Sequence, residues 1–162
     1  MTEGENVMTR HASRAVAAVA ALALLIPTVA IASPGSGVAN ITTVSDGGLA
    51  GPTKVNIPGI VKLQTYEDLR VLTQTLTIHP DGNTGWHSHP GPVLVTVKSG
   101  IFRYQETDCS YIDYSAGQTI LDPGNGHVHI GRSVGTVDLE LSVTYLIPPG
   151  VAPRIDEPAT DC

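Results

Sequence analysis

From residue 68 onward, hydrophobic and polar side chains alternate over short stretches, which is the pattern of half-buried β-strands. The clearest stretch is DLRVLTQTLTIHPDG at 68–82, which is rich in Val, Leu, Thr and Ile and ends on the turn residues Pro80, Asp81 and Gly82. Five further strand candidates are bounded by Gly, Pro, Asp or Ser and occupy 92–100, 101–107, 116–126, 127–133 and 136–150. No stretch after residue 33 has the 3.6-residue period of an amphipathic helix.

Short strands at close spacing predict an all-β sandwich or barrel, and the composition agrees. The 162 residues include 17 Gly and 12 Pro, and only 15% are charged, which suits strands joined by tight turns. The net charge of -6 argues against a nucleic-acid partner. We expect one β-domain at 61–162, preceded at 33–60 by a linker or a lead-in strand, because that region lacks sustained periodicity.

The first 32 residues have the layout of a targeting segment. Arg10 and Arg14 precede an uncharged stretch of 18 residues that ends in the small residues of Ala30-Ile31-Ala32. This order predicts a secretory signal peptide cleaved before Ser33. Eighteen uncharged residues are also just long enough to span a bilayer, so an uncleaved membrane anchor is the alternative. Both interpretations place the rest of the chain outside the cytoplasm, secreted or in the cell envelope, with a membrane contact only if the segment stays uncleaved.

The exported part contains two cysteines, Cys109 and Cys162. An even number of cysteines in an oxidising compartment predicts a disulfide, which here would tie the C-terminus to a mid-chain loop. The alternative is a pair of thiolate metal ligands. It is less favoured, because neither cysteine has a cysteine or histidine neighbour at ligand spacing.

Two histidine pairs are the candidate chemistry of the chain. His87 and His89 in GWHSHPG are two positions apart, so on an extended strand both imidazoles project from the same face. His127 and His129 in GHVHIG repeat this spacing. Converging imidazoles are typical ligands of a divalent metal, so we expect the two segments to meet at a shared metal site.

The first histidine segment resembles the first motif of the cupins, which are small jelly-roll β-barrels. That motif reads Gly-x5-His-x-His-x3-4-Glu-x6-Gly. His87-x-His89 is followed here by three residues, Val93, six residues and Gly100, so valine takes the place of the glutamate. The opening glycine, Gly82, lies one residue closer than in the family pattern.

The second cupin motif, Gly-x5-Pro-x-Gly-x2-His-x3-Asn, also has a counterpart. Gly117 precedes Pro123 by six positions, Gly126 precedes His129 by three, and Ser133 takes the place of the asparagine. One extra residue separates Pro123 from Gly126. The resemblance covers roughly residues 66–148 and implies a cupin-type jelly-roll barrel, a fold in which a homodimer through the barrel edges is common.

Carried over position by position, the resemblance implies that His87, His89 and His129 are metal ligands, with Val93 at the fourth position. Three neutral imidazoles without a carboxylate suit iron, zinc, copper or nickel better than manganese. Some cupin-like thiol dioxygenases bind iron through three histidines alone, so the missing glutamate is compatible with an active site.

The role of His127 is open. It could be a fourth ligand, a hydrogen-bond partner of a ligand, or a proton shuttle. The alternative for the whole cluster is a degenerate barrel that keeps the fold and has lost tight metal affinity. Further polar candidates are Gln74 and Tyr104, which could reach the barrel interior, and Arg132 and Arg154, which could bind an anionic group or lie at the surface.

Two functional classes remain. In one, the protein is an oxygenase or isomerase whose metal keeps an open position for a small, partly apolar substrate. In the other, it is a non-catalytic module of the cell envelope that binds a metal or a small ligand. No nucleophile elbow, phosphate-binding glycine loop or nucleotide fingerprint occurs in the sequence, which argues against a serine hydrolase, a kinase or a dehydrogenase.

Overall fold

The computed structural model describes residue 1 and residues 32–162. The predicted signal or anchor segment, 1–32, therefore lies outside the described residues apart from its two ends. In the part that the structure describes, no helix is long and apolar enough to cross a membrane.

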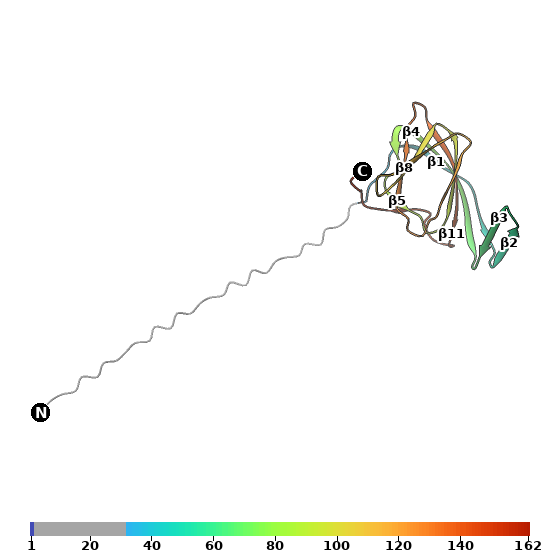
Figure 1. Cartoon of the computed structure of the whole chain (residues 1–162), viewed down its shortest axis with the longest axis horizontal. Helices are drawn as coiled ribbons and strands as arrows, with labels where there is room; N and C mark the ends of the chain where they lie inside the picture. The colour runs from blue at the N-terminus through green and yellow to red at the C-terminus, as the bar shows by residue number, and fades with distance from the viewer. Residues whose placement is uncertain (2–31) are drawn as a thin grey trace.

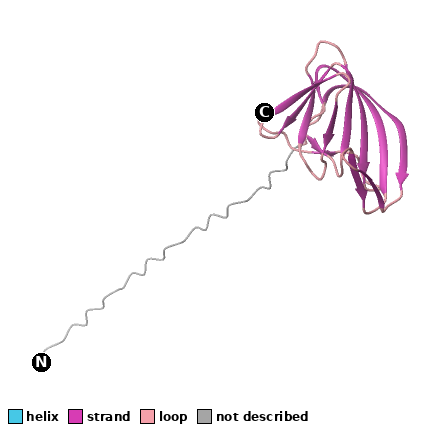
Figure 2. Cartoon of the chain, turned by 45° about the vertical axis from the view of Figure 1, so that its right-hand side comes forward, coloured by secondary structure: helices cyan, strands magenta, loops and turns pink. Residues whose placement is uncertain are grey.

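Residues 32–162 consist of strands and loops without a helix, which confirms the all-β prediction (Figure 2). The strands are β1 (Ser36–Leu49), β2 (Thr53–Ile57), β3 (Val61–Thr65), β4 (Leu69–Asn83), β5 (His87–Ser88), β6 (Val93–Ser99), β7 (Ile101–Glu106), β8 (Tyr111–Ser115), β9 (Thr119–Asp122), β10 (His129–Ser133), β11 (Leu139–Ile147) and β12 (Ile155–Asp156).

Ten of these strands form one antiparallel sheet that curves into a nearly closed barrel (Figure 1). One half has the order β1-β4-β11-β6-β9, and the other contains β12-β5-β10-β7-β8. The halves join where Arg132 of β10 pairs with Asn83 of β4. This is the jelly-roll architecture expected from the cupin resemblance. The hairpin of β2 and β3 forms a separate two-stranded sheet that projects away from the barrel (Figure 1).

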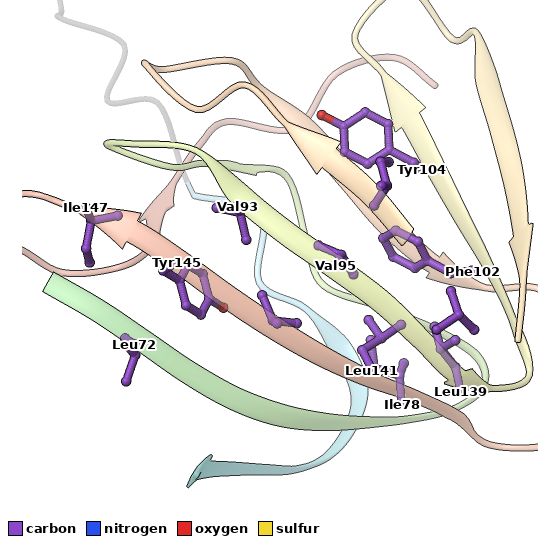
Figure 3. Packing of buried hydrophobic residues seen from close by; sticks show 13 residues of the cluster. Leu72, Ile78, Val93, Val95, Phe102, Tyr104, Leu139, Leu141, Tyr145 and Ile147 are labelled. Carbon is purple, nitrogen blue, oxygen red and sulfur yellow. The ribbon is translucent and has the colours of Figure 1, made fainter. Parts of the chain in front are cut away.

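The barrel interior is filled from strands with strict alternation (Figure 3). Every second residue of β11, from Leu139 to Ile147, is buried, and the residues between them are partly exposed. The same parity buries Val93, Val95 and Val97 of β6, which pairs with β11. A side-chain period of two therefore directs one face of each strand into the core, as the sequence pattern predicts.

The predicted end of the long strand is wrong in one respect. Pro80, Asp81 and Gly82 were expected to form a turn, but β4 continues through them to Asn83. The turn residues instead form an irregularity within the strand. Asp81 has a φ of 63°, and the β1–β4 register shifts between Ser36 and Val38. The extension lets β4 reach β10 and brings the histidine segments together.

The C-terminal segment is fixed to β5 and to residues beside the barrel's first histidine segment. β12 pairs with β5, and the main chain of Glu157 bonds to Trp86 and Ser33. The predicted disulfide between Cys109 and Cys162 is present and has a Cα–Cα distance of 5.5 Å. These contacts hold residues 153–156 beside the histidine segments.

Candidate metal centre

His87, His89 and His129 meet inside the barrel. His87 lies in β5 and pairs directly with His129, the first residue of β10, while His89 follows β5 by one residue. The ring centroids are 4.3 Å apart for His87 and His129, 4.8 Å for His87 and His89, and 5.3 Å for His89 and His129. One ring nitrogen of each lies within 4.8 Å of the others, and all three residues are buried. The spacing of two residues gives His87 and His89 the shared face that the sequence predicted.

All three rings are held by their Nδ1 atoms. His87 Nδ1 lies 2.8 Å from the carbonyl of Gly85, and His89 Nδ1 lies 2.7 Å from the carbonyl of Pro153. His129 Nδ1 hydrogen-bonds to the carbonyl of His127 over 3.3 Å and lies 3.1 Å from a carboxylate oxygen of Asp122. Carbonyl and carboxylate oxygens only accept, so each neutral ring carries its proton on Nδ1 and leaves the Nε2 lone pair free for a metal.

The environment keeps these imidazoles neutral. Burial, together with the neighbouring groups His129, Arg154 and His89, lowers the pKa of His87 to about 2. Burial lowers the pKa of His129 to about 4, although the carboxylate of Asp122 acts in the opposite direction. Burial also lowers the pKa of His89. Neutral imidazole is the form that binds a metal, so the site is ready to bind at neutral pH.

Asp122 links His129 to a chain of hydrogen bonds that leads to the surface. The Tyr104 hydroxyl donates to Asp122 over 2.8 Å and lies 3.1 Å from Nδ1 of His127. The other side of the His127 ring reaches Glu106, with Nε2 and Oε2 3.1 Å apart. Asp122 and Tyr104 are buried, whereas His127 and Glu106 are partly exposed. Two hydrogen bonds, through Tyr104, connect the His127 ring to Asp122, and Asp122 in turn contacts His129. The His127 side chain therefore lies outside the group of three histidines.

Asp122, His127 and His129 also form a second cluster of metal-ligand types. Its atoms already have partners, because the Tyr104 hydroxyl bonds to both Asp122 and His127, and Asp122 also accepts from the backbone of Gly124 over 2.6 Å. Neither Asp122 nor His127 lines the two cavities that border the three histidines. This second cluster is thus explained as a hydrogen-bonded support for His129.

Val93, at the position of the family glutamate, is fully buried in the apolar core. It pairs with Asp122 of β9 and with Tyr145 of β11. The three histidines consequently form the whole group of converging ligand atoms on this face. Three imidazoles with room for further ligands fit iron, zinc, copper or nickel. A fourth ligand with a carboxylate group is missing among the described residues, which disfavours manganese.

A chamber of about 510 Å³ opens beside the histidines, and His87 and His89 form part of its wall. A deeper cavity of about 40 Å³ is bordered by all three histidines. The two spaces share several lining residues: Leu76, Thr84, His87, His89 and Tyr145. A small molecule in the chamber would therefore have access to the Nε2 side of the site.

The remaining sequence candidates lie in different places. Gln74 and Arg154 line the chamber. Tyr104 is buried and supports Asp122, while Arg132 donates to the side chain of Gln105 over 2.8 Å, away from the chamber.

Two site residues, Asp122 and Tyr145, were not found from the sequence. Asp122 precedes Pro-Gly and looks like a turn residue, so nothing in the sequence indicates its contact with His129. Tyr145 could have been found, because it has the parity of the buried residues of β11. Because β11 pairs with β4 and β6, the side chains on this face of the strand point into the barrel, and Tyr145 contacts His89.

Solved structures with a similar fold include a protein with a double-stranded β-helix domain from Klebsiella pneumoniae. It is 18% identical, with a TM-score of 0.48, and the match covers 55% of this chain and 76% of that one. A cupin superfamily protein from Desulfitobacterium hafniense is 14% identical, with a TM-score of 0.44 over 66% and 82% of the two chains. A cupin-2 domain protein from Shewanella frigidimarina is 14% identical, with a TM-score of 0.40 over 47% and 70%.

No family model and no curated protein matches the chain.

Proposed function

We propose that this protein is an exported single-domain cupin that binds one divalent transition metal through Nε2 of His87, His89 and His129. The observation that carries the proposal is that three buried histidines each bring one ring nitrogen within 4.8 Å of the others. Each Nδ1 faces a protein acceptor at 2.7–3.1 Å, so the Nε2 lone pairs of the three rings remain free. Imidazoles whose Nδ1 atoms are held in this way are typical metal ligands.

We infer that the protein is a small-molecule oxygenase or isomerase. When bound, the metal would supply Lewis-acid or redox chemistry to a substrate in the chamber. The chain would contribute a preformed site: His87 and His89 lie in the chamber wall, and apolar side chains such as Ile41 and Leu76 would exclude water from the bound molecule.

A non-catalytic binding module of the cell envelope is the alternative, and one observation favours it. Among the described residues that line the chamber, Asp156 is the one carboxylate, and it already pairs with Arg154 at 2.6 Å. The chamber wall therefore offers no unpaired carboxylate among the described residues to act as a general acid or base. Recovery of a bound small molecule unchanged after incubation, seen by mass spectrometry, would support the module, whereas a product would support the enzyme.

Export is supported by the disulfide between Cys109 and Cys162, because such bonds persist in oxidising compartments. The small-residue site before Ser33 supports cleavage. Mass spectrometry of the protein recovered from outside the cytoplasm is expected to find Ser33 at the N-terminus. An intact Met1 in the membrane fraction would favour the anchor instead.

Elemental analysis tests the metal site. The purified protein, reconstituted with Zn²⁺ and desalted, is expected to retain close to one zinc per chain. Replacing His87, His89 or His129 by alanine should each remove it. His79→Ala is the matched control, because His79 is an exposed histidine in the same chain that pairs with Asp138, and this variant should bind zinc like the wild type. A wild type that retains no zinc would contradict the proposed site.

A further inference from the structure

The chamber wall contains a tyrosine whose hydroxyl has no partner among the described residues. Tyr145 is 6% exposed and lines the chamber, and its hydroxyl makes no hydrogen bond to any other residue in 32–162. Its ring packs edge-on against His89, with centroids 5.5 Å apart, so the residue lies next to the candidate metal site. A phenolic hydroxyl at the wall of a chamber can donate a hydrogen bond to a ligand bound there.

A guanidinium group borders the same space. Arg154 is the one Arg or Lys among the described residues that line the chamber. It lines the chamber together with His87, His89 and Tyr145, so the guanidinium borders the same space as all three groups. Its Nε donates to Asp156 over 2.6 Å, and its terminal nitrogens make no hydrogen bond within the part of the chain described. The terminal nitrogens of the Arg154 guanidinium can therefore still donate to a carboxylate.

The charge of the site favours an anion. Asp156 balances the charge of Arg154, and the three imidazoles are neutral. Valine at position 93 supplies no carboxylate, and Asp122 contacts His129 without lining the chamber, so a divalent ion held by the three histidines would have no anionic ligand among the described residues. An anionic ligand would supply the missing negative charge.

Much of the remaining chamber wall is apolar, beside the polar side chains of Gln74 and Thr84. Val38 and Ile41 of β1 and Leu76 of β4 line it, and Ile41 and Leu76 are directly paired in the sheet. A volume of about 510 Å³ accommodates a small organic molecule. Apolar walls opposite one group of polar atoms suit a ligand with a hydrocarbon body and a single charged end.

We propose that the chamber binds a small organic carboxylate with an apolar body, and that Arg154 and Tyr145 receive its carboxylate beside the metal. This inference rests on the proposed metal site and adds to it the class of ligand. Arg154 supplies charge-assisted hydrogen bonds, and the Tyr145 hydroxyl gains the acceptor that it lacks.

The test compares two probes of equal shape, pentanoate and neutral pentanamide, by calorimetric titration of the zinc-loaded protein. Pentanoate is expected to bind at least about tenfold more tightly than pentanamide, because only the anion can use the guanidinium and the metal charge. Arg154→Gln and Tyr145→Phe should each weaken pentanoate binding by about five- to tenfold, since each removes one hydrogen-bonding partner of the carboxylate. Both variants should keep the zinc content of the wild type.

Arg103→Gln is the matched control. Arg103 forms a similar pair with Asp113, with Nε and Oδ1 2.7 Å apart, but it does not line the chamber, so pentanoate binding should not change. Zinc-loaded protein that binds both probes equally, or that loses no affinity for pentanoate in either variant, would overturn the carboxylate site and leave the metal site intact. A wild type that takes up no zinc would overturn both proposals.

Discussion

Asp122 determines how His129 is presented. Its Oδ2 lies 3.1 Å from Nδ1 of His129 and accepts a hydrogen bond from Tyr104, while its Oδ1 accepts from the backbone of Gly124. The carboxylate is buried and therefore held in one position. Such a partner fixes the tautomer and direction of a ligating imidazole and raises its basicity, whereas His87 and His89 have only neutral carbonyls in this role.

Asp122→Asn is expected to weaken zinc binding by about 10- to 100-fold, because the amide keeps the shape but loses the charge that orients His129. Tyr104→Phe should have a smaller effect in the same direction, since it removes one hydrogen bond to Asp122. Competition with a chromophoric chelator measures the affinity. Asp138→Asn is the control, because Asp138 pairs with an exposed histidine at 2.9 Å. Equal affinity of the Asp122→Asn variant and the wild type would refute this role.

At the scale of elements, the C-terminal segment completes the site from a distance in sequence. Pro153 supplies the carbonyl that holds His89, and Arg154 borders the chamber. The segment is held by the pairing of β12 with β5, by the bond from Ser88 to Glu157 and by the disulfide beyond them. The cross-link closes a loop of 53 residues, which restricts the unfolded chain.

The double variant Cys109→Ser with Cys162→Ser is expected to lose about 4 kcal/mol of unfolding free energy, the chain-entropy value for a loop of this length. Urea unfolding followed by the fluorescence of Trp86 measures the change. Reduction of the wild type should produce a similar shift. A double variant as stable as the oxidised wild type would show that the bridge adds nothing to stability.

The strands that sequence reasoning found are those with one buried face. β6 and β11 alternate because one side of each meets the core, and β4 directs Leu72 and Ile78 to the same core. β8 was missed: four of its five residues are exposed, so burial imposes no alternation on it. The hairpin of β2 and β3 was missed for the same reason, because it projects from the barrel and is exposed along almost its whole length.

The candidate site was predictable to a similar degree. The spacing of two residues identified the shared face of His87 and His89, and the resemblance to a known motif added His129. The partners of the three Nδ1 atoms could not be predicted, since they include the carbonyl of Pro153, which is brought in by tertiary contacts. The roles of Asp122 and Tyr145 likewise depend on strand pairing.

At the scale of the whole molecule, the buried histidines make stability depend on pH. In the unfolded chain their pKa is about 6.5, whereas in the folded protein it is about 2 for His87 and about 4 for His129. Between these values the unfolded state binds protons that the folded state excludes, so the free energy of unfolding falls as the pH is lowered through this window.

We expect the metal-free protein to lose stability steadily from about pH 7 to pH 5.5, a range above the titration of ordinary carboxylates. Urea unfolding at several pH values measures the slope. His87→Gln should give a shallower slope, since it removes one of the groups whose pKa is lowered. A stability that does not vary with pH in this range would contradict the burial of neutral histidines.

The most direct test of the central claim is to observe the histidine ring nitrogens by ¹⁵N NMR during a titration with Zn²⁺. Before zinc is added, His87, His89 and His129 should each be neutral with the proton on Nδ1. At one equivalent, the Nε2 signals of these three rings should shift together, while the rings of His79 and His127 stay unchanged. Coordination through Nδ1, a shift of His127 in place of one of the three, or no response to zinc would contradict the proposed centre.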